Sequence, residues 1–278
     1  MQIFLNGQFV AENRAVVSVF DRGFLYGDGL FETTRVVNGR PFRWAQHLAR
    51  LQRGADFLKI KLPFTPTELR DFADQLIHQN RLPDSLLRLT VSRGVGARGY
   101  SPKGADRPTV VMSLHPAPGL EPAPGWKLIT ASLRLPAGDP LAQFKTCNKL
   151  WQVLARAEAD AAQADEALLL NINGQVAEAT SANVFWVEGG AVQTPALDGG
   201  ILPGVTRAAV LEICRQAGLP VAEEGTTPCR LRHADGIFLA LSSWGIVEVA
   251  SLDGVEQKKS PLTGHLRKAY QELLLSSS

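Results

Sequence analysis

The sequence predicts a two-domain protein of the α/β class, and three observations support this prediction. The chain has 278 residues, enough for one large or two medium domains with apolar cores of their own. Segments with strand-like alternation and segments with helical spacing follow one another along the chain. Residues 116–125 are rich in proline, interrupt every periodic pattern and are typical of a semi-rigid spacer. We therefore expect an N-terminal domain over residues 1–115, a linker over residues 116–125 and a C-terminal domain over residues 126–278.

Composition and charge argue against several classes of protein. The 29 lysines and arginines nearly balance the 27 aspartates and glutamates, and a formal charge of +2 is too small to indicate a nucleic acid or an anionic membrane as partner. The three cysteines are odd in number and lack CxxC spacing, so we expect neither a disulfide framework nor a metal site. No apolar run reaches the roughly 18 residues of a membrane helix. The first ten residues do not resemble a signal peptide, so we expect a cytoplasmic protein.

The N-terminal half is expected to contain strands, two helices and two glycine-rich loops. Residues 3–10 predict a tight hairpin, because the Asn6-Gly7 pair suits the positive φ angles of a type I′ turn. A glycine-rich loop over residues 21–29 precedes a strand over residues 30–37. Helical spacing follows over residues 44–58, and Thr65 to Glu68 form a capping box that begins a second helix. Strands over residues 87–92 and 109–114 flank the second glycine-rich loop.

The C-terminal half combines six predicted strands with three predicted helices. Alternating or apolar runs predict strands over residues 126–133, 166–170, 175–177, 183–187, 237–241 and 246–250. Helical spacing predicts helices over residues 148–163 and 260–275. A further helix is expected between Gly204 and Gly218, because glycine commonly ends helices. Residues 199–207 therefore lead into a helix N-terminus, whose free N–H groups can bind an anion.

Lys145 is the first candidate for a catalytic residue. An unprotonated lysine amine can hold an aldehyde as a Schiff base, and pyridoxal phosphate is the usual aldehyde. This cofactor also needs a carboxylate facing its ring nitrogen, for which Glu178 is a candidate, and a cradle for its phosphate, for which the helix start at Gly204 is a candidate. Taken singly, each of these residues is more typical of a solvated surface charge or an ordinary helix cap.

The order of these residues resembles that of a known enzyme family. Lys145, Asn148, Glu178, Asn183 and the run Gly204-Val205-Thr206-Arg207 together resemble the fold-type IV pyridoxal-phosphate enzymes, which include branched-chain and D-amino-acid aminotransferases and aminodeoxychorismate lyase. The resemblance extends over nearly the whole chain. It implies a smaller N-terminal α/β domain, a larger C-terminal β-barrel-like domain with helices, pyridoxal 5'-phosphate as cofactor, and a homodimer.

The resemblance also implies which residues hold the cofactor. The stretch from His47 to Leu51 matches the HxxRL element of the family, whose arginine contacts the cofactor phosphate, and an arginine fork suits that contact. Lys145 is the implied catalytic residue. The implied cofactor-binding residues are Arg50, Lys145, Glu178, Ser181, Ala182, Asn183, Gly204, Val205, Thr206, Ser242 and Ser243. Without the resemblance, His47 and Arg50 fit a solvated polar face of a helix, and Thr206 fits an ordinary cap.

Residues 92–102 carry the substrate hypothesis. Their glycines are equally typical of a mobile hairpin, but Arg93, Arg98 and Tyr100 on a flexible loop also suit closure over a carboxylate. The run is similar to the SRGxGxRGY stretch of aminodeoxychorismate lyases, and Arg98 falls where D-amino-acid aminotransferases bind the substrate carboxylate. The implied substrate-binding residues are Tyr26, Phe31, Thr33, Arg98 and Tyr100. Phe31 and Tyr100 replace a tyrosine and a histidine of those transaminases, which counts against a plain D-amino-acid transaminase.

The expected function is therefore a pyridoxal-phosphate-dependent lyase. It would convert 4-amino-4-deoxychorismate to 4-aminobenzoate and pyruvate in folate precursor synthesis. The first alternative is an aminotransferase of D-amino acids or branched-chain amino acids with a 2-oxo acid acceptor. A distant alternative is a cofactor-free α/β binding protein in which Lys145 is a surface residue.

Overall fold

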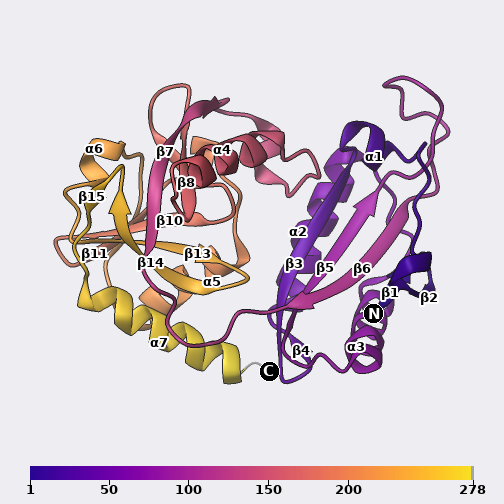
Figure 1. Ribbon diagram of the computed structural model, residues 1–278, viewed down its shortest axis with the longest axis horizontal. Helices are drawn as coiled ribbons and strands as arrows, with labels where there is room; N and C mark the ends of the chain where they lie inside the picture. The colour runs from indigo at the N-terminus through magenta and orange to yellow at the C-terminus, as the bar shows by residue number, and fades with distance from the viewer. Residues whose placement is uncertain (277–278) are drawn as a thin grey trace. The chain divides into compact units, whose positions relative to one another are not determined.

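The computed structural model describes residues 1–276, which form two compact units (Figure 1). Unit 1 contains Met1–Pro118 together with Phe144–Lys149 and, of the described residues, 274–276. Unit 2 contains Gly119–Gln143 and Leu150–Leu273. The segment Phe144–Lys149, which carries Lys145, therefore belongs to unit 1, although its sequence position lies within the range expected for the C-terminal domain.

Unit 1 is built on a six-stranded sheet in which every neighbouring pair is antiparallel. The strand order is β2-β1-β6-β5-β3-β4. The strands are β1 (Gln2–Leu5), β2 (Gln8–Ala11), β3 (Gly29–Val37), β4 (Arg40–Pro41), β5 (Ser85–Ser92) and β6 (Thr109–Pro116). The expected hairpin at Asn6-Gly7 is confirmed, since both residues have positive φ and β1 pairs with β2.

Two long helices, α2 (Trp44–Leu58) and α3 (Pro66–Asn80), share one apolar core with this sheet. The expected capping box of α3 is confirmed: Glu68 N–H donates to the Thr65 hydroxyl oxygen, and Thr65 N–H donates to the Glu68 carboxylate. The ring of Phe72 on α3 stacks on Phe4 of β1 with centroids 4.4 Å apart. This contact fixes α3 against β1, and the shared core holds α2 against β3, the strand that carries Phe31 and Thr33.

The glycine-rich segment before β3 is not a loop throughout, as the sequence had suggested. It contains a one-turn helix, α1 (Arg22–Tyr26), and a short 3-10 turn, η1 (Glu12–Arg14), lies upstream. The Asp21 carboxylate caps α1 by accepting the Gly23 N–H, and Gly27 ends it in the left-handed conformation with φ +67°. One turn is too short to show helical periodicity in a sequence, and these two caps hold it in place.

Unit 2 is built on a nine-stranded mixed sheet in the order β12-β11-β10-β13-β14-β7-β8-β9, with β15 beside β14. The strands are β7 (Trp126–Leu135), β8 (Glu166–Asn171), β9 (Val176–Ala179), β10 (Asn183–Glu188), β11 (Ala191–Thr194), β12 (Val221–Glu223), β13 (Gly236–Leu241), β14 (Gly245–Leu252) and β15 (Val255–Glu256). The sheet curls, since β9 at one end of the strand order contacts β10, and this confirms the expected barrel-like shape. Figure 1 shows the curled sheet with its helices.

Helices surround this curled sheet. They are α4 (Leu150–Ala161), α5 (Val205–Gln216), α6 (Pro228–Leu231) and α7 (Pro261–Ser276), with the 3-10 turns η2 (Pro140–Gln143) and η3 (Leu197–Gly199). The predicted helix over residues 148–163 begins two residues later than expected, at Leu150. None of the helices among residues 1–276 is both long and apolar enough to span a bilayer.

Candidate active site

The backbone around Lys145 is fixed against the start of β3. The Lys145 carbonyl accepts the Phe31 N–H at 2.9 Å, and the Cys147 N–H donates to the Gly29 carbonyl at 2.8 Å. Leu30 and Thr146 form the bridge between these two bonds. The segment thus lies along β3 as a short additional strand. Lys145 does not lie in a helix. Its backbone position depends on pairing with β3, which lies more than a hundred residues earlier in the sequence.

The Lys145 amine and the Arg88 guanidinium both contact the ring of Phe31. Lys145 Nζ lies 4.7 Å from the ring centroid, and Arg88 Cζ lies 4.0 Å from it, both within cation–π range. Burial lowers the pKa of Arg88. Within residues 1–276, no carboxylate forms an ion pair with Arg88. The face of β5 that carries Arg88 therefore presents a partly desolvated cation.

A second charged group near Lys145 is the buried cluster of Glu32, His47 and Arg50. Arg50 donates from Nε to Glu32 Oε1 at 2.8 Å and from Nη2 to Oε2 at 2.6 Å, and His47 Nδ1 lies 2.7 Å from Oε2. Burial would raise the pKa of Glu32, but the hydrogen bonds from Arg50 and His47 outweigh it and lower the pKa to about 2. Glu32 is therefore ionised at neutral pH.

His47 is neutral in this cluster at neutral pH. Burial lowers its pKa and outweighs the hydrogen bond and charge of Glu32, while the positive charges of Arg50 and Lys145 lower it further. The neutral ring then donates its Nδ1 proton to Glu32. The interpretation of His47 and Arg50 as a solvated helix face is wrong, since both side chains are buried. Glu32 was not among the residues expected from the sequence.

Cys147, two residues after Lys145, is not suited to be a nucleophile. Burial raises the pKa of its thiol, although Arg88 and Lys149 nearby act in the opposite direction. The protonated thiol lies beside Gly29, where a Cβ would contact its sulfur. Cys147 therefore fills space at the junction of β3 with the Lys145 segment.

In unit 2, Glu178 and Asn183 hold the turn that precedes α5. The Glu178 Oε2 atom accepts the Leu202 N–H at 3.0 Å, and the Asn183 side-chain amide donates to the Leu202 carbonyl at 2.9 Å. Asn183 begins β10, where it pairs with Ala240 near the end of β13. The last residues of β9 and β13 and the first residue of β10 therefore lie near the turn that starts α5.

The start of α5 leaves its first N–H groups without a side-chain cap. Gly204 is the N-cap residue and has no side chain to accept from Val205 or Thr206. A Cβ on residue 204 would overlap the Asn183 side-chain oxygen, so another residue here would displace the Asn183 side chain from its bond to Leu202. Val205 and Thr206 are buried, whereas Arg207 is engaged with Glu223 and the Pro195 carbonyl. An uncapped helix start of this kind is suited to bind a phosphate.

Glu166 is a second buried carboxylate that the sequence interpretation missed. It lies at the start of β8 and accepts hydrogen bonds from the Thr180 and Ser181 hydroxyls. It thereby fixes the turn between β9 and β10, which carries Ser181 and Ala182. A glutamate that opens an otherwise apolar strand was the only signal for it in the sequence. Ser242 and Ser243 lie partly buried in the turn between β13 and β14.

The structure thus groups the expected site residues within each unit. In unit 1, Lys145, Phe31 and Arg50 come together around β3, and Thr33 lies opposite Arg88 in the register of β3 and β5. Two of the expected residues in unit 2, Glu178 and Asn183, meet at Leu202 before α5. Unit 2 also contains Ser181, Ala182, Gly204, Val205, Thr206, Ser242 and Ser243. No cluster of histidine, cysteine, aspartate or glutamate within residues 1–276 is arranged to hold a metal ion.

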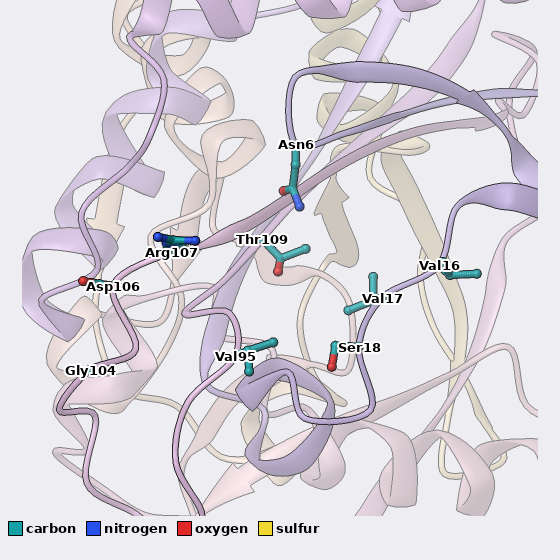
Figure 2. A pocket seen from close by; sticks show the side chains of 9 residues that line it. All are labelled: Asn6, Val16, Val17, Ser18, Val95, Gly104, Asp106, Arg107 and Thr109. Carbon is teal, nitrogen blue, oxygen red and sulfur yellow. The ribbon is translucent and has the colours of Figure 1, made fainter.

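A cavity of about 600 Å³ in unit 1 is separate from these groups (Figure 2). It is lined by Asn6, Val16, Val17, Ser18, Val95, Gly104, Asp106, Arg107 and Thr109. None of these is a residue expected to bind cofactor or substrate. This cavity is therefore not part of the candidate site around Lys145.

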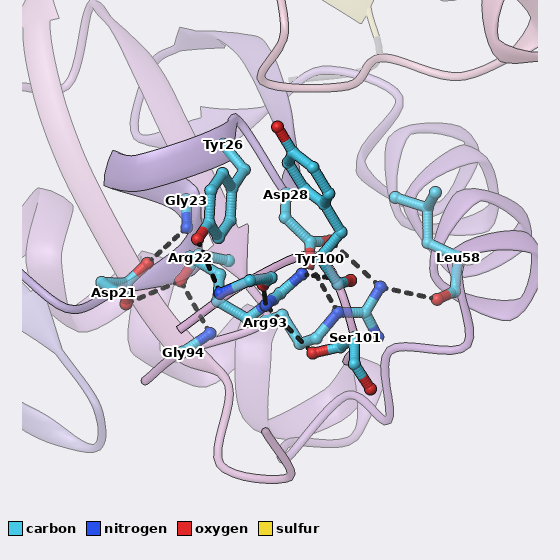
Figure 3. Close-up of polar contacts among 12 residues, drawn as sticks. Asp21, Arg22, Gly23, Tyr26, Asp28, Leu58, Arg93, Gly94, Tyr100 and Ser101 are labelled. Carbon is cyan, nitrogen blue, oxygen red and sulfur yellow. Dashed lines mark hydrogen bonds and ion pairs between the residues drawn. The ribbon is translucent and has the colours of Figure 1, made fainter. Parts of the chain in front are cut away.

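The second glycine-rich loop is anchored by buried side chains (Figure 3). Arg93 donates two hydrogen bonds to Asp28 and further ones to the Leu58 and Lys59 carbonyls, so its guanidinium is used in holding the loop. Tyr26 accepts the Gly99 N–H through its hydroxyl at 3.2 Å, and its ring lies 5.5 Å from that of Tyr100. Tyr100 is 88% exposed, and the Arg98 side chain is exposed as well. Of the two loop arginines, only Arg98 is exposed to solvent.

Comparisons with known proteins agree with this arrangement. A family model described as amino-transferase class IV matches residues 29–252. The chain belongs to the class IV aminotransferase family. The chain is 38% identical to a "putative branched-chain-amino-acid aminotransferase" of Methanocaldococcus jannaschii, over 98% of this chain and 96% of that protein. It is 35% identical to the aminodeoxychorismate lyase of Bacillus subtilis, over 91% of this chain and 87% of that protein.

A solved structure of this family shows both the fold and the cofactor. The T.th. branched-chain amino acid aminotransferase with pyridoxamine 5'-phosphate superimposes with a TM-score of 0.93 and 29% identity, covering 100% of this chain and 95% of that one. Class IV aminotransferases use pyridoxal 5'-phosphate, which confirms the expected cofactor and excludes the hypothesis of a cofactor-free binding protein. The residues present fit the cofactor, because the start of α5 at Gly204 has no side-chain cap and leaves its first N–H groups to bind the cofactor phosphate.

Proposed function

We propose that this class IV enzyme is a lyase that converts 4-amino-4-deoxychorismate to 4-aminobenzoate and pyruvate. The observation that carries the proposal is the Phe31 ring, which holds the Lys145 amine and the Arg88 guanidinium. Arg88 offers a charge-assisted hydrogen bond to a carboxylate close to the reactive amine. The exposed Arg98 offers a second one. Two cations suit a substrate that carries a ring carboxylate and an enolpyruvyl carboxylate.

We propose the following roles for the residues that hold the cofactor. Lys145 binds the aldehyde, Glu178 faces the ring nitrogen, and the N–H groups of Val205 and Thr206 bind the phosphate. Arg50, Ser242 and Ser243 complete the phosphate contacts, while Ser181, Ala182, Asn183 and Gly204 shape the cradle. Arg50 is suited to this role, since its two hydrogen bonds to Glu32 fix the orientation of its guanidinium.

Lys145 performs the proton transfers in this proposal. When bound, the cofactor supplies an electron sink that spreads the charge left by the departing α-proton. Glu178 keeps the ring nitrogen protonated. The Lys145 amine accepts the proton from the carbon that bears the substrate amine. The bond from the neighbouring carbon to the enolpyruvyl oxygen then breaks, pyruvate leaves after taking up a proton, and the ring becomes aromatic, which drives the reaction forward.

A second candidate is an aminotransferase, which the 38% identity to the branched-chain-type relative favours. In that case the Lys145 amine would pass the proton on without an elimination, and water would release a 2-oxo acid while the amino group stayed with the bound cofactor. The same residues serve both reactions. Whether elimination or transamination follows depends on whether the substrate carries a leaving group on the carbon next to the one that loses its proton.

One incubation series separates the two candidates. Holoenzyme is mixed with aminodeoxychorismate, D-alanine or L-leucine, and 4-aminobenzoate release and cofactor absorbance are followed. Continuous 4-aminobenzoate formation without an added 2-oxo acid supports the lyase. Conversion of the cofactor to its pyridoxamine form by either amino acid, with no 4-aminobenzoate, overturns the lyase in favour of the transaminase. Lys145→Ala should lose the protein-bound chromophore and both activities, while the exposed Lys61→Ala should retain them.

We also propose that the enzyme is a cytoplasmic homodimer. Several large apolar side chains of unit 1 are exposed in the single chain, among them Val16 at 76%, Phe20 at 65% and Phe24 at 74%. Such a group of apolar side chains is typical of a surface covered by another protein chain. Light scattering coupled to size exclusion chromatography measures the mass, and a monomer across the micromolar range would refute this proposal.

A further inference from the structure

Arg22 is a buried arginine whose guanidinium binds three successive carbonyls of one loop. It is 3% exposed, and its Nη1 donates to the carbonyls of Gly99 at 2.9 Å and Ser101 at 3.2 Å. Its Nη2 donates to the Tyr100 carbonyl at 3.0 Å (Figure 3). No role in cofactor or substrate binding follows from this position. The side chain instead determines the backbone path on both sides of Tyr100.

Asp28 holds Arg22 in the orientation that makes these bonds. Its Oδ2 atom accepts from Arg22 Nε and from Arg93 Nε, each at 2.8 Å. Burial would raise the pKa of Asp28, but the hydrogen bonds and charges of Arg93 and Arg22 outweigh it and lower the pKa, so the carboxylate is ionised. Arg93 in turn donates to the Leu58 carbonyl at the end of α2. The loop is therefore tied through Asp28 to the helix that carries His47 and Arg50.

The backbone of Arg22 is fixed independently of its side chain. Its N–H donates to the Gly94 carbonyl at 2.9 Å. The preceding residue, Asp21, accepts from the Ser92 hydroxyl at 2.9 Å and from the Thr109 hydroxyl at 2.7 Å. Ser92 and Thr109 are the residues from which the loop leaves the sheet and to which it returns. Arg22 thus starts from the base of the loop and reaches its outer part.

The segment that Arg22 binds lies next to two of the proposed substrate-binding residues, since it contains Tyr100 and follows Arg98. Arg98 immediately precedes Gly99, whose φ of +104° favours glycine and whose N–H donates to the Tyr26 hydroxyl. The Tyr26 ring also lies 5.0 Å from the Arg22 guanidinium. The Arg98 and Tyr100 side chains are both exposed to solvent, and the Tyr100 ring lies 5.5 Å from the Tyr26 ring. The direction of both side chains therefore follows from the path of residues 99–101.

We propose that Arg22 is a positioning residue that sets the conformation of residues 98–101 and thereby presents Arg98 to the carboxylate of the substrate. The proposal rests on the proposed function in one respect, the role of Arg98. A lysine cannot replace Arg22, because a single ammonium cannot reproduce a planar fork that donates to Asp28 and to three carbonyls at once. Binding would then need little reordering of the loop, which lowers its entropic cost.

The first arm of the test measures the loop conformation and needs no substrate. Trypsin cleavage after Arg98 is followed by mass spectrometry in holoenzyme under native conditions. Arg22→Ala and Arg22→Lys should both accelerate this cleavage about tenfold or more, because each loses charge-assisted hydrogen bonds to the loop. Arg53→Ala on the exposed face of α2 is the matched control and should cleave like the wild type. Equal cleavage in the wild type and in a folded Arg22→Lys variant would overturn the proposal.

The second arm tests whether Arg22 acts through Arg98. Arg22→Lys should raise KM for the carboxylate substrate about tenfold while kcat changes less than threefold, consistent with lost charge-assisted contacts. In an Arg98→Ala background the same substitution should leave KM unchanged. Full additivity of the two effects would show that Arg22 does not act through Arg98. If the wild type releases no 4-aminobenzoate from aminodeoxychorismate, the proposed lyase function fails, but the proteolysis still decides the role of Arg22 in the loop.

Discussion

The carboxylate of Glu32 and the guanidinium of Arg50 form a two-point ion pair in which both side chains are at most 5% exposed. The pair joins β3 to α2 and lies on the strand against which Lys145 is held. A buried pair contributes little compared with a well-packed apolar pair, but the loss of one partner leaves the other charge buried and uncompensated. Stability should therefore respond strongly to a change at either residue.

Replacing Glu32 by glutamine tests this pair directly. Glu32→Gln keeps the shape of the side chain but leaves Arg50 charged and buried, so we expect a loss of about 3–5 kcal/mol in the free energy of unfolding. Urea denaturation at pH 7 measures it. The surface variant Glu121→Gln is the control and should stay within about 0.5 kcal/mol of the wild type. A loss under 1 kcal/mol for Glu32→Gln would contradict the prediction.

Acid should destabilise the protein through the same cluster. The pKa of Glu32 falls from its ordinary value of 4.5 to about 2, so its contribution is present above pH 4.5 and is lost as the pH falls toward 2. A shift of that size corresponds to about 3 kcal/mol. His47, whose pKa is lowered, adds to the loss below its ordinary value of 6.5, because the unfolded chain binds its proton more readily. Denaturation curves from pH 7 to pH 3 should show this decline, and Glu32→Gln should reduce its slope below pH 4.5.

Arg88 should affect substrate binding more than cofactor binding. Arg88→Met keeps most of the apolar contact with Phe31 but removes the cation, so kcat/KM for a carboxylate substrate should fall roughly 10- to 100-fold, mainly through KM. The absorbance of the protein-bound cofactor should not change. Arg40→Ala is the control, since the Arg40 side chain on β4 is exposed. A KM equal to that of the wild type would exclude Arg88 from the substrate site.

Gly94 should not tolerate a side chain. It has φ +84°, and a Cβ there would overlap the carbonyl of Arg107, a backbone atom that cannot move without the loop. Gly94→Ala should cost about 3 kcal/mol, from the left-handed conformation and the steric overlap together. Gly104→Ala has a similar φ of +80° but open space around it, so about 1 kcal/mol is expected. Thermal unfolding of both variants compares the two effects, and equal losses would show that the overlap is relieved.

Much of the fold was accessible from the sequence because its signals are local. The Thr65 capping box, the Asn6-Gly7 turn and the alternation of β5 each depend on a few neighbouring residues, and all three are confirmed. Helix α1 was missed because its caps, Asp21 and Gly27, enclose only one turn. A periodic pattern needs several turns to appear.

The parts of the site that were missed depend on contacts distant in the sequence. Glu32 is buried because α2 supplies Arg50 and His47, and Arg88 is half-buried because Phe31 lies on the adjacent strand. Neither partner is visible from the alternation of a single strand. The Lys145 segment also pairs with β3 across more than a hundred residues. The roles proposed for Lys145 and Glu178 came from the order of motifs along the chain. That order does not tell how far apart the two residues lie in space.

The placement of Phe144–Lys149 in unit 1 limits how the protein can be divided. A polypeptide that ends at Pro118 would lack the strand segment that satisfies the backbone groups of Gly29 and Phe31. Its partner fragment, beginning at Gly119, would carry Lys145 on a segment without its β3 neighbour. Each fragment alone would leave backbone groups of this pairing unsatisfied, so a dissection that keeps unit 1 whole must join residues 144–149 to residues 1–118.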